Sequence, residues 1–217
     1  MSSSVRRSSR LASKHKLEEP APSAPAKKPK SSKKTAVKPE EKPEKKPANK
    51  ALKIDDAIPD IVLKNQDDED VSLKQIASEN RIVAIFAYPK ASTPGCTKQA
   101  CGFSQNYGDL SKKAKIFGLS SDSPKAQKNF MVKQSLKLDG LLCDPEKKLI
   151  GPLGAKKSPN GIKRSHWIFV DGYLKVSRVQ ISPLVSVDEA KEEIEEIYSN
   201  LTTDEEPKKD LEESDEK

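Results

Sequence analysis

Long apolar stretches are missing from this sequence of 217 residues. The longest uninterrupted apolar run, Ile82 to Tyr88, has seven residues, whereas a helix needs about 20 to cross a bilayer. The first thirty residues also lack the apolar centre of a secretory signal peptide. We therefore expect no membrane-spanning segment, no secretory signal and no membrane partner.

Cysteine and histidine are scarce as well. The chain has three cysteines and two histidines, His15 and His166. Three thiols cannot build the disulfide framework of a small secreted domain. With His15 in the charged N-terminal part, too few ligands remain for a structural zinc site. The sequence thus predicts no metal, and the thiols are interpreted as reactive or buried groups.

The net charge of +7 is distributed unevenly along the sequence. Residues 1–50 hold 15 basic and 5 acidic residues, seven prolines, no glycine and no aromatic. Residues 202–217 hold 3 basic and 8 acidic residues, whereas residues 51–201 hold 22 and 20. The two ends have too few apolar side chains to offset the entropy of ordering. We predict a disordered basic tail over 1–50, one folded domain over 51–201 and a disordered acidic tail over 202–217.

The basic tail groups its lysines, and residues 27–34 read K-K-P-K-S-S-K-K. Clustered lysines beside a proline are typical of nuclear import signals and of nucleic-acid patches. The sequence therefore predicts an import receptor as partner and location in the nucleus, with the cytoplasm as a second compartment. Weak, non-specific contact with nucleic acid phosphates is a further expectation. A tail that only increases solubility is the remaining alternative.

Strand and helix patterns alternate through residues 51–201. In the first half we expect a hairpin over 61–63 and 71–73, a buried strand over 81–88 and a helix over 97–113. A strand over 115–119 and a helix from Pro124 to Leu136, capped by Ser123, should follow. The last elements should be a hairpin of 165–170 and 174–179 around Asp171-Gly172, and a helix to Leu201 with a capping box of Ser186 and Glu189. This order predicts an α/β domain with a mixed sheet.

The segment over residues 88–101, Y-P-K-A-S-T-P-G-C-T-K-Q-A-C, carries the main chemical signal. It places Cys96 after a buried strand and a Pro-Gly break, at the start of a helix. Free N–H groups and the helix dipole favour a thiolate there. A buried, inert cysteine is the alternative. The polar surroundings favour the reactive thiol.

Cys101 follows five positions later, which in an unbroken helix means a rise of about 7.5 Å and a rotation of about 500°. A disulfide needs Cα atoms within about 6.8 Å and converging side chains. Bonding Cys96 to Cys101 would therefore require the start of the helix to unwind. The spacing is also wider than the C-x-x-C pair of a thioredoxin-like reductase or isomerase, which argues against that activity.

The pattern P-x-x-x-T-P-x-C, formed by Pro89, Thr93, Pro94 and Cys96, resembles the active-site signature of peroxiredoxins. The following C-T-x-x-x-C is similar to the bacterioferritin-comigratory/PrxQ subfamily. The likeness extends over 53–201, and includes G-L-S-S-D-S at 118–123, L-L-C-D-P at 141–145 and R-S-H-W-I-F-V-D-G from Arg164. It implies a thioredoxin-like, three-layer domain around a central mixed sheet. With the basic tail, the chain is similar to fungal nuclear thiol peroxidases.

The resemblance also implies an activity. Cys96 would be the peroxidatic nucleophile that reduces hydrogen peroxide and alkyl hydroperoxides, and Cys101 the resolving cysteine that forms an intramolecular disulfide with it. Thioredoxin would then act as the reductant. Such a peroxidase requires no metal, haem or flavin cofactor. Separately, the lack of an obvious hydrophobic extension in the sequence favours a monomer.

Three further residues take roles from the resemblance. Arg164 would stabilise the Cys96 thiolate and polarise the peroxide, Thr93 would orient the peroxide through its hydroxyl, and Pro89 with Pro94 would shape the loop.

Two positions depart from the family pattern. Gln99 stands where Glu is common, and Cys143 where Ser is common; we interpret Cys143 as a small buried residue. The alternative function is a nuclear or chromatin-associated binding protein that acts through its basic tail.

Overall fold

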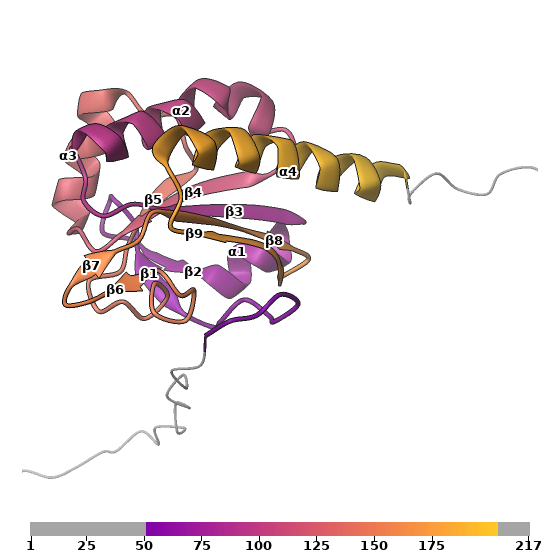
Figure 1. Ribbon diagram of the computed structural model, residues 1–217, viewed down its shortest axis with the longest axis horizontal. Helices are drawn as coiled ribbons and strands as arrows, with labels where there is room; N and C mark the ends of the chain where they lie inside the picture. The colour runs from indigo at the N-terminus through magenta and orange to yellow at the C-terminus, as the bar shows by residue number, and fades with distance from the viewer. Residues whose placement is uncertain (1–50, 204–217) are drawn as a thin grey trace, which may run out of the picture. The chain divides into compact units, whose positions relative to one another are not determined.

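The computed structural model describes residues 51–203. These residues form a seven-stranded sheet with strand order β2-β1-β5-β4-β3-β8-β9, a separate β6-β7 hairpin and four helices (Figure 1). The elements in chain order are β1 (Val62–Lys64), β2 (Asp70–Ser72), α1 (Leu73–Glu79), β3 (Ile82–Ala87), α2 (Pro94–Leu110), β4 (Lys115–Ser120), α3 (Pro124–Gln134), β5 (Gly140–Cys143), β6 (Lys156–Lys157), β7 (Gly161–Ile162), β8 (Ser165–Val170), β9 (Tyr173–Val179) and α4 (Pro183–Thr203).

The sheet is mixed, as predicted. β3, β4 and β5 run parallel, while β8 pairs with β3 antiparallel, and β9 with β8. β3 lies inside the sheet between β4 and β8, and all six of its residues are buried. The buried strand expected over 81–88 is therefore confirmed, and its carboxyl end leads directly into residues 88–93, the loop before Cys96, which we call the cysteine loop.

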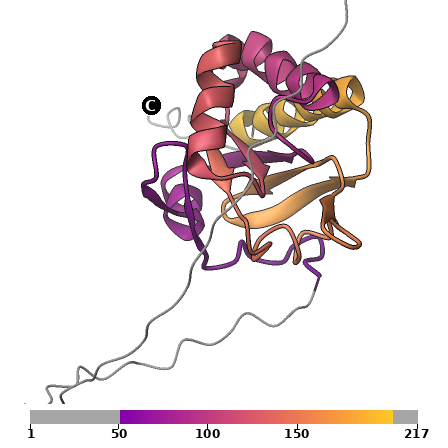
Figure 2. The same ribbon diagram turned by 90° about the vertical axis from the view of Figure 1, so that its left-hand side faces the viewer.

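Helices cover the two faces of the sheet unequally (Figures 1 and 2). Side chains of α2, α3 and α4 pack on one face, around Phe86, Phe103, Phe130 and Ile194. On the other face, α1 and the segment from Leu149 to Ile162 pack around Trp167. The result is the three-layer, thioredoxin-like architecture that the resemblance implied.

Helix boundaries differ from the expected ones. α2 begins at Pro94, three residues before the expected start, because proline is well suited to the first helical position. α3 ends at Gln134, since Ser135 adopts the left-handed conformation with φ +49°, so Leu136 lies outside the helix. The sequence reading missed α1, a seven-residue helix capped by the Ser72 side chain.

The predicted capping box at Ser186 is wrong. α4 begins at Pro183, and the Ser186 amide donates a hydrogen bond to the Ser182 carbonyl (3.0 Å), as expected inside a helix. The Ser186 side chain is buried and has partners on two other elements. It is therefore unavailable to cap the helix.

Both tails, with the import signal and the acidic end, lie outside the described residues apart from Thr202 and Thr203, which complete α4. The predicted domain boundaries stay predictions. Among residues 51–203, no helix combines the length and the apolar character needed to cross a membrane.

Candidate active site

Cys96 is the third residue of α2, and its side chain is 1% exposed. Thr93 is the N-cap residue, and Pro94 occupies the first position of the helix. The cap is extended, and its carbonyl accepts a hydrogen bond from the Thr97 amide at 2.8 Å. The thiol therefore lies in the first turn of α2, where unpaired N–H groups and the helix dipole favour negative charge.

Arg164 brings a positive charge to this thiol from the residue just before β8. Its Nη2 atom lies 3.5 Å from the Cys96 sulfur, and Nη1 donates a hydrogen bond to Gln99 Oε1 at 2.7 Å. The Arg164 carbonyl accepts bonds from the amides of Gln180 and Ile181, which anchor the backbone at this point. Gln99 thus holds the guanidinium, and the two amides hold the Arg164 backbone. In this position the guanidinium can stabilise a thiolate and an oxygen that gains negative charge.

Gly95 leaves room for the close approach of Arg164. A Cβ atom at this position would lie 3.1 Å from Arg164 Nη2, closer than nine in ten real Cβ contacts, so the guanidinium would have to shift by a few tenths of an ångström. Because glycine has no side chain, the guanidinium can lie directly against the first turn of α2.

The loop before α2 is tied to the loop after β4. The Ala91 amide donates a bond to Asp122 at 2.7 Å, and the Ser120 hydroxyl donates to the same carboxylate oxygen at 2.8 Å. The G-L-S-S-D-S motif therefore supports the cysteine loop. Thr93 donates its hydroxyl to the Lys90 carbonyl at 2.9 Å, and Pro89 is exposed. Neither residue has a described contact with Cys96, so their proposed roles stay predictions.

Cys101 lies on the same continuous helix as Cys96, and both thiols are free. The Cys101 sulfur is partly buried and lies 4.0 Å from Gln134 Oε1 on α3. Helix geometry separates positions 96 and 101 by about 7.5 Å along the axis. A disulfide between them therefore requires the start of α2 to unwind.

Cys143 is buried at the end of β5, with 2% of its surface exposed. Burial raises the pKa of this thiol to about 12, with smaller contributions from the negative charges of Asp122 and Asp68. The neutral thiol is thus favoured at physiological pH. The interpretation of Cys143 as a small buried residue is confirmed.

The sequence analysis missed a set of polar residues behind Arg164. Gln99 is fully buried and bonded to both Arg164 and Ser186, so the amide that replaces the family's Glu does form hydrogen bonds. His166 follows on β8 and contacts Glu193 of α4. A buried histidine in the strand that begins after Arg164 was the available signal.

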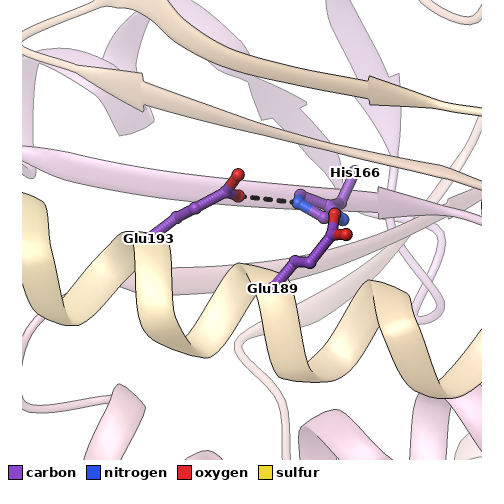
Figure 3. A group of neighbouring side chains, drawn as sticks. All are labelled: His166, Glu189 and Glu193. Atoms are coloured by element: carbon purple, nitrogen blue, oxygen red, sulfur yellow. Dashed lines mark hydrogen bonds and ion pairs between the residues drawn. The ribbon is translucent and has the colours of Figure 1, made fainter.

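His166, Glu189 and Glu193 are also close enough to hold a metal ion, since their ligand atoms lie within 4.8 Å of one another (Figure 3). Arg178, however, already provides a positive charge next to both carboxylates. Its guanidinium lies 2.8 Å from Glu193 Oε1 and 3.7 Å from Glu189 Oε2. A second positive charge would be repelled there, so we interpret the cluster as an ion-pair network.

Comparisons with known proteins show the family. Residues 54–177, more than half of the chain, match the AhpC/TSA family. The chain belongs to this family. It is 48% identical over 146 residues to "Peroxiredoxin bcp1" of Schizosaccharomyces pombe, a match that covers 65% of this chain and 74% of that protein. It is 36% identical over 133 residues to "Peroxiredoxin Bcp" of Escherichia coli, covering 57% and 83%.

A solved structure is similar as well. The bacterioferritin comigratory protein of Xanthomonas campestris, described for its alkyl peroxide reduction activity, aligns with a TM-score of 0.60 and 25% identity, covering 66% of this chain and 99% of that chain. The expected peroxiredoxin family and its bacterioferritin-comigratory/PrxQ branch are thus confirmed.

Proposed function

We propose that this peroxiredoxin reduces hydrogen peroxide and alkyl hydroperoxides with Cys96 as its nucleophile, Cys101 as its resolving thiol and thioredoxin as its reductant. The observation that carries the proposal is the Arg164 guanidinium, 3.5 Å from a thiol in the first turn of α2. The alkyl peroxide activity described for the Xanthomonas campestris protein supports this substrate class.

In the first step, the Cys96 thiolate attacks one peroxide oxygen. A sulfur–oxygen bond forms and the oxygen–oxygen bond breaks, so sulfur loses two electrons and becomes a sulfenic acid. The other oxygen leaves with the electron pair, takes a proton from solvent and departs as water or an alcohol. Arg164 stabilises the negative charge on the reacting atoms because its fixed donors already face them.

In the second step, the Cys101 thiol condenses with the sulfenic acid, forms a disulfide and releases water. This step needs the unwinding of α2 described above. A reduced dithiol protein then attacks the disulfide, and two exchanges restore both thiols while the reductant is oxidised. The electrons therefore pass from thioredoxin to the peroxide.

The nucleophile is tested by NADPH-coupled turnover of peroxide with thioredoxin and thioredoxin reductase. Cys96→Ser is expected to abolish turnover, whereas Cys143→Ser, a matched thiol substitution, is expected to retain it. Turnover that survives Cys96→Ser would show that another group attacks the peroxide.

The resolving thiol is tested separately. Cys101→Ser is expected to leave a sulfenic acid that dimedone traps on Cys96, and to lose turnover driven by thioredoxin. The intact mass of the unmodified protein after one equivalent of peroxide is expected to fall by two hydrogens, mapped to a peptide pair of Cys96 and Cys101. A disulfide that includes Cys143 would contradict this assignment.

We also propose that the basic tail directs the protein to the nucleus through an import receptor. The lysine clusters support this, and no described residue bears on it. A fluorescent fusion of the full chain is expected in the nucleus, and one lacking residues 1–50 in the cytoplasm; equal distribution would contradict the role. The comparisons do not favour the alternative of a binding protein that acts through its tail, since the named relatives are peroxiredoxins.

A further inference from the structure

A line of hydrogen bonds, here called the hydrogen-bond chain, leads from Arg164 at the active site to Glu193, where α4 faces β8. Arg164 Nη1 donates to Gln99 Oε1 at 2.7 Å, and Gln99 Nε2 donates to Ser186 Oγ at 2.8 Å. Ser186 Oγ lies 3.2 Å from His166 Nδ1, and His166 Nε2 lies 2.9 Å from Glu193 Oε2. Gln99, Ser186 and His166 are each at most 1% exposed. Water therefore cannot replace these bonds when one is lost.

The partners determine the direction of the bonds at the Arg164 and Glu193 ends, and the His166 tautomer determines the direction of the bond to Ser186. Arginine only donates, so the Gln99 oxygen faces Arg164 and the Gln99 nitrogen faces Ser186. Ser186 Oγ accepts from this nitrogen, which leaves its own hydrogen for His166 Nδ1. At the other end, a carboxylate accepts from His166 Nε2. The chain is satisfied when His166 carries its hydrogen on Nε2 and leaves Nδ1 bare.

Glu193 is held in its accepting form. Desolvation alone would raise its pKa, but hydrogen bonds from His166 and Arg178 outweigh that effect and lower the pKa of Glu193 below its ordinary value. Figure 3 shows the Glu193 carboxylate reaching from α4 to the His166 ring on the sheet. The chain therefore ends at a fixed negative charge.

The chain joins the three elements that meet at the active site. Gln99 is in the second turn of α2, Ser186 and Glu193 are on α4, and His166 is in β8. Gln99 also lies between the two cysteines of the proposed cycle. The turn that must unwind for disulfide formation is thus the turn that the chain ties to α4.

We propose that Ser186 and His166 are positioning residues for peroxide reduction, which act through Gln99 to hold Arg164 against the Cys96 sulfur and to keep the second turn of α2 folded. This inference rests on the proposed function and assigns the control of its two steps to a hydrogen-bond chain. These hydrogen bonds favour the attack of Cys96 on the peroxide, and they oppose the unwinding of α2 that precedes disulfide formation.

Loss of one bond in the hydrogen-bond chain should therefore change the rates of the two steps, peroxide reduction and disulfide formation, in opposite directions. In Ser186→Ala, the rate constant for Cys96 oxidation by hydrogen peroxide is expected to fall roughly tenfold, the effect of losing one bond that orients a charged group. The rate of disulfide formation from the sulfenic acid is expected to rise severalfold. Rapid quenching with a thiol reagent, followed by mass spectrometry, measures both rates in the full-length chain.

Two control variants separate positioning from general loss of stability. Ala190→Gly weakens α4 at a fully buried position without touching the chain. It is expected to lower the free energy of unfolding and to leave the ratio of the two rates unchanged. Glu189→Gln alters the neighbouring carboxylate on the same helix, and is expected to leave both rates unchanged.

A spectroscopic test leaves every residue of the hydrogen-bond chain unchanged. The sequence has two histidines, so His15→Gln leaves His166 as the only imidazole. Its nitrogen chemical shifts are expected to show a protonated Nε2 and a bare Nδ1. A bare Nε2 would mean that His166 donates no hydrogen bond to Glu193, and it would overturn the proposed hydrogen-bond chain.

Kinetic outcomes distinguish the two proposals. Failure of peroxide to oxidise Cys96 in the unmodified protein would overturn the proposed function and this inference together. Normal oxidation, with both rates unchanged in Ser186→Ala or both changed in the same direction, would overturn the positioning role alone.

Discussion

Arg164 Nη2 lies 3.5 Å from the sulfur of Cys96, although the two residues are 68 positions apart in the chain. The antiparallel pairing of β3 and β8 explains this approach. Ala87 at the end of β3 pairs with Ser165 at the start of β8, so the residues that flank these ends lie on the same edge of the sheet. The cysteine loop follows one strand, and Arg164 precedes the other.

Substitution of Arg164 tests the importance of this contact. Arg164→Met is expected to slow Cys96 oxidation by about 10²- to 10³-fold, as for loss of a donor that stabilises developing negative charge. Arg164→Lys keeps the charge but cannot reach both Cys96 and Gln99 with a planar fork, so an intermediate loss is expected. Stopped-flow measurements with hydrogen peroxide give the rates. Arg81→Met, at the opposite end of β3, is the control and should have no effect.

A pair of glycines on α2 tests the close approach of the guanidinium. Gly95→Ala places a methyl group 3.1 Å from Arg164 Nη2 and is expected to slow peroxide reduction severalfold, because the flexible end of Arg164 must move. Gly108→Ala has no heavy atom within 4 Å and serves as the matched control. It should stabilise the helix by about 0.5–1 kcal/mol without changing the rate. Equal rates in the two variants would contradict the role of Gly95.

Gly102 tests the packing of α2 on α4. A Cβ atom at this position would lie 2.8 Å from Val187 Cγ2, so Gly102→Ala is expected to cost about 1–3 kcal/mol of stability through overpacking. Adding Val187→Ala creates space and should recover part of that loss. Urea unfolding of both single variants and the double variant measures the coupling. Additive costs would show that the two side chains do not compete for the same volume.

Cys143 is expected to resist alkylation in the folded protein at neutral pH. Its thiol is buried and its pKa is raised to about 12, so the reactive thiolate is scarce. A time course with a maleimide, resolved by peptide mass spectrometry, should show Cys101 modified well before Cys143. In urea, the two should react at similar rates. Fast labelling of Cys143 in the native protein would contradict its buried position.

Glu193 is expected to make stability dependent on pH in the acid range. Because its pKa is lowered on folding, its contribution is fully present above the ordinary value of 4.5 and is lost as the pH falls through the folded value. Glu193→Gln should therefore cost about 1–2 kcal/mol near neutral pH. The difference from the unmodified protein should shrink below about pH 4.5. Urea titrations across pH test this sign, and a constant difference would contradict it.

Two serines with the same local capping pattern, Ser72 and Ser186, behave differently in the structure. Ser72 and Gln75 have the spacing of a capping box, and Ser72 does cap α1, which the sequence reading overlooked. Ser186 and Glu189 have the same spacing, yet Ser186 is inside α4. The difference is that the Ser186 hydroxyl is buried against Gln99 and His166, contacts that no local pattern reveals.

The sequence by itself determined the buried strand, the position of Cys96 near the start of a helix, the mixed sheet and, by resemblance, the family. Each depends on neighbouring residues: an apolar run, a Pro-Gly break, a capping serine, a motif of adjacent positions. The resemblance implied that Arg164 acts on Cys96, but only the tertiary structure decided the geometry of this contact and showed that Gln99, Ser186 and His166 connect the arginine to Glu193. Those contacts depend on strand pairing and on the packing of α4, because burial makes a hydrogen bond between distant residues necessary only after the fold has brought them together.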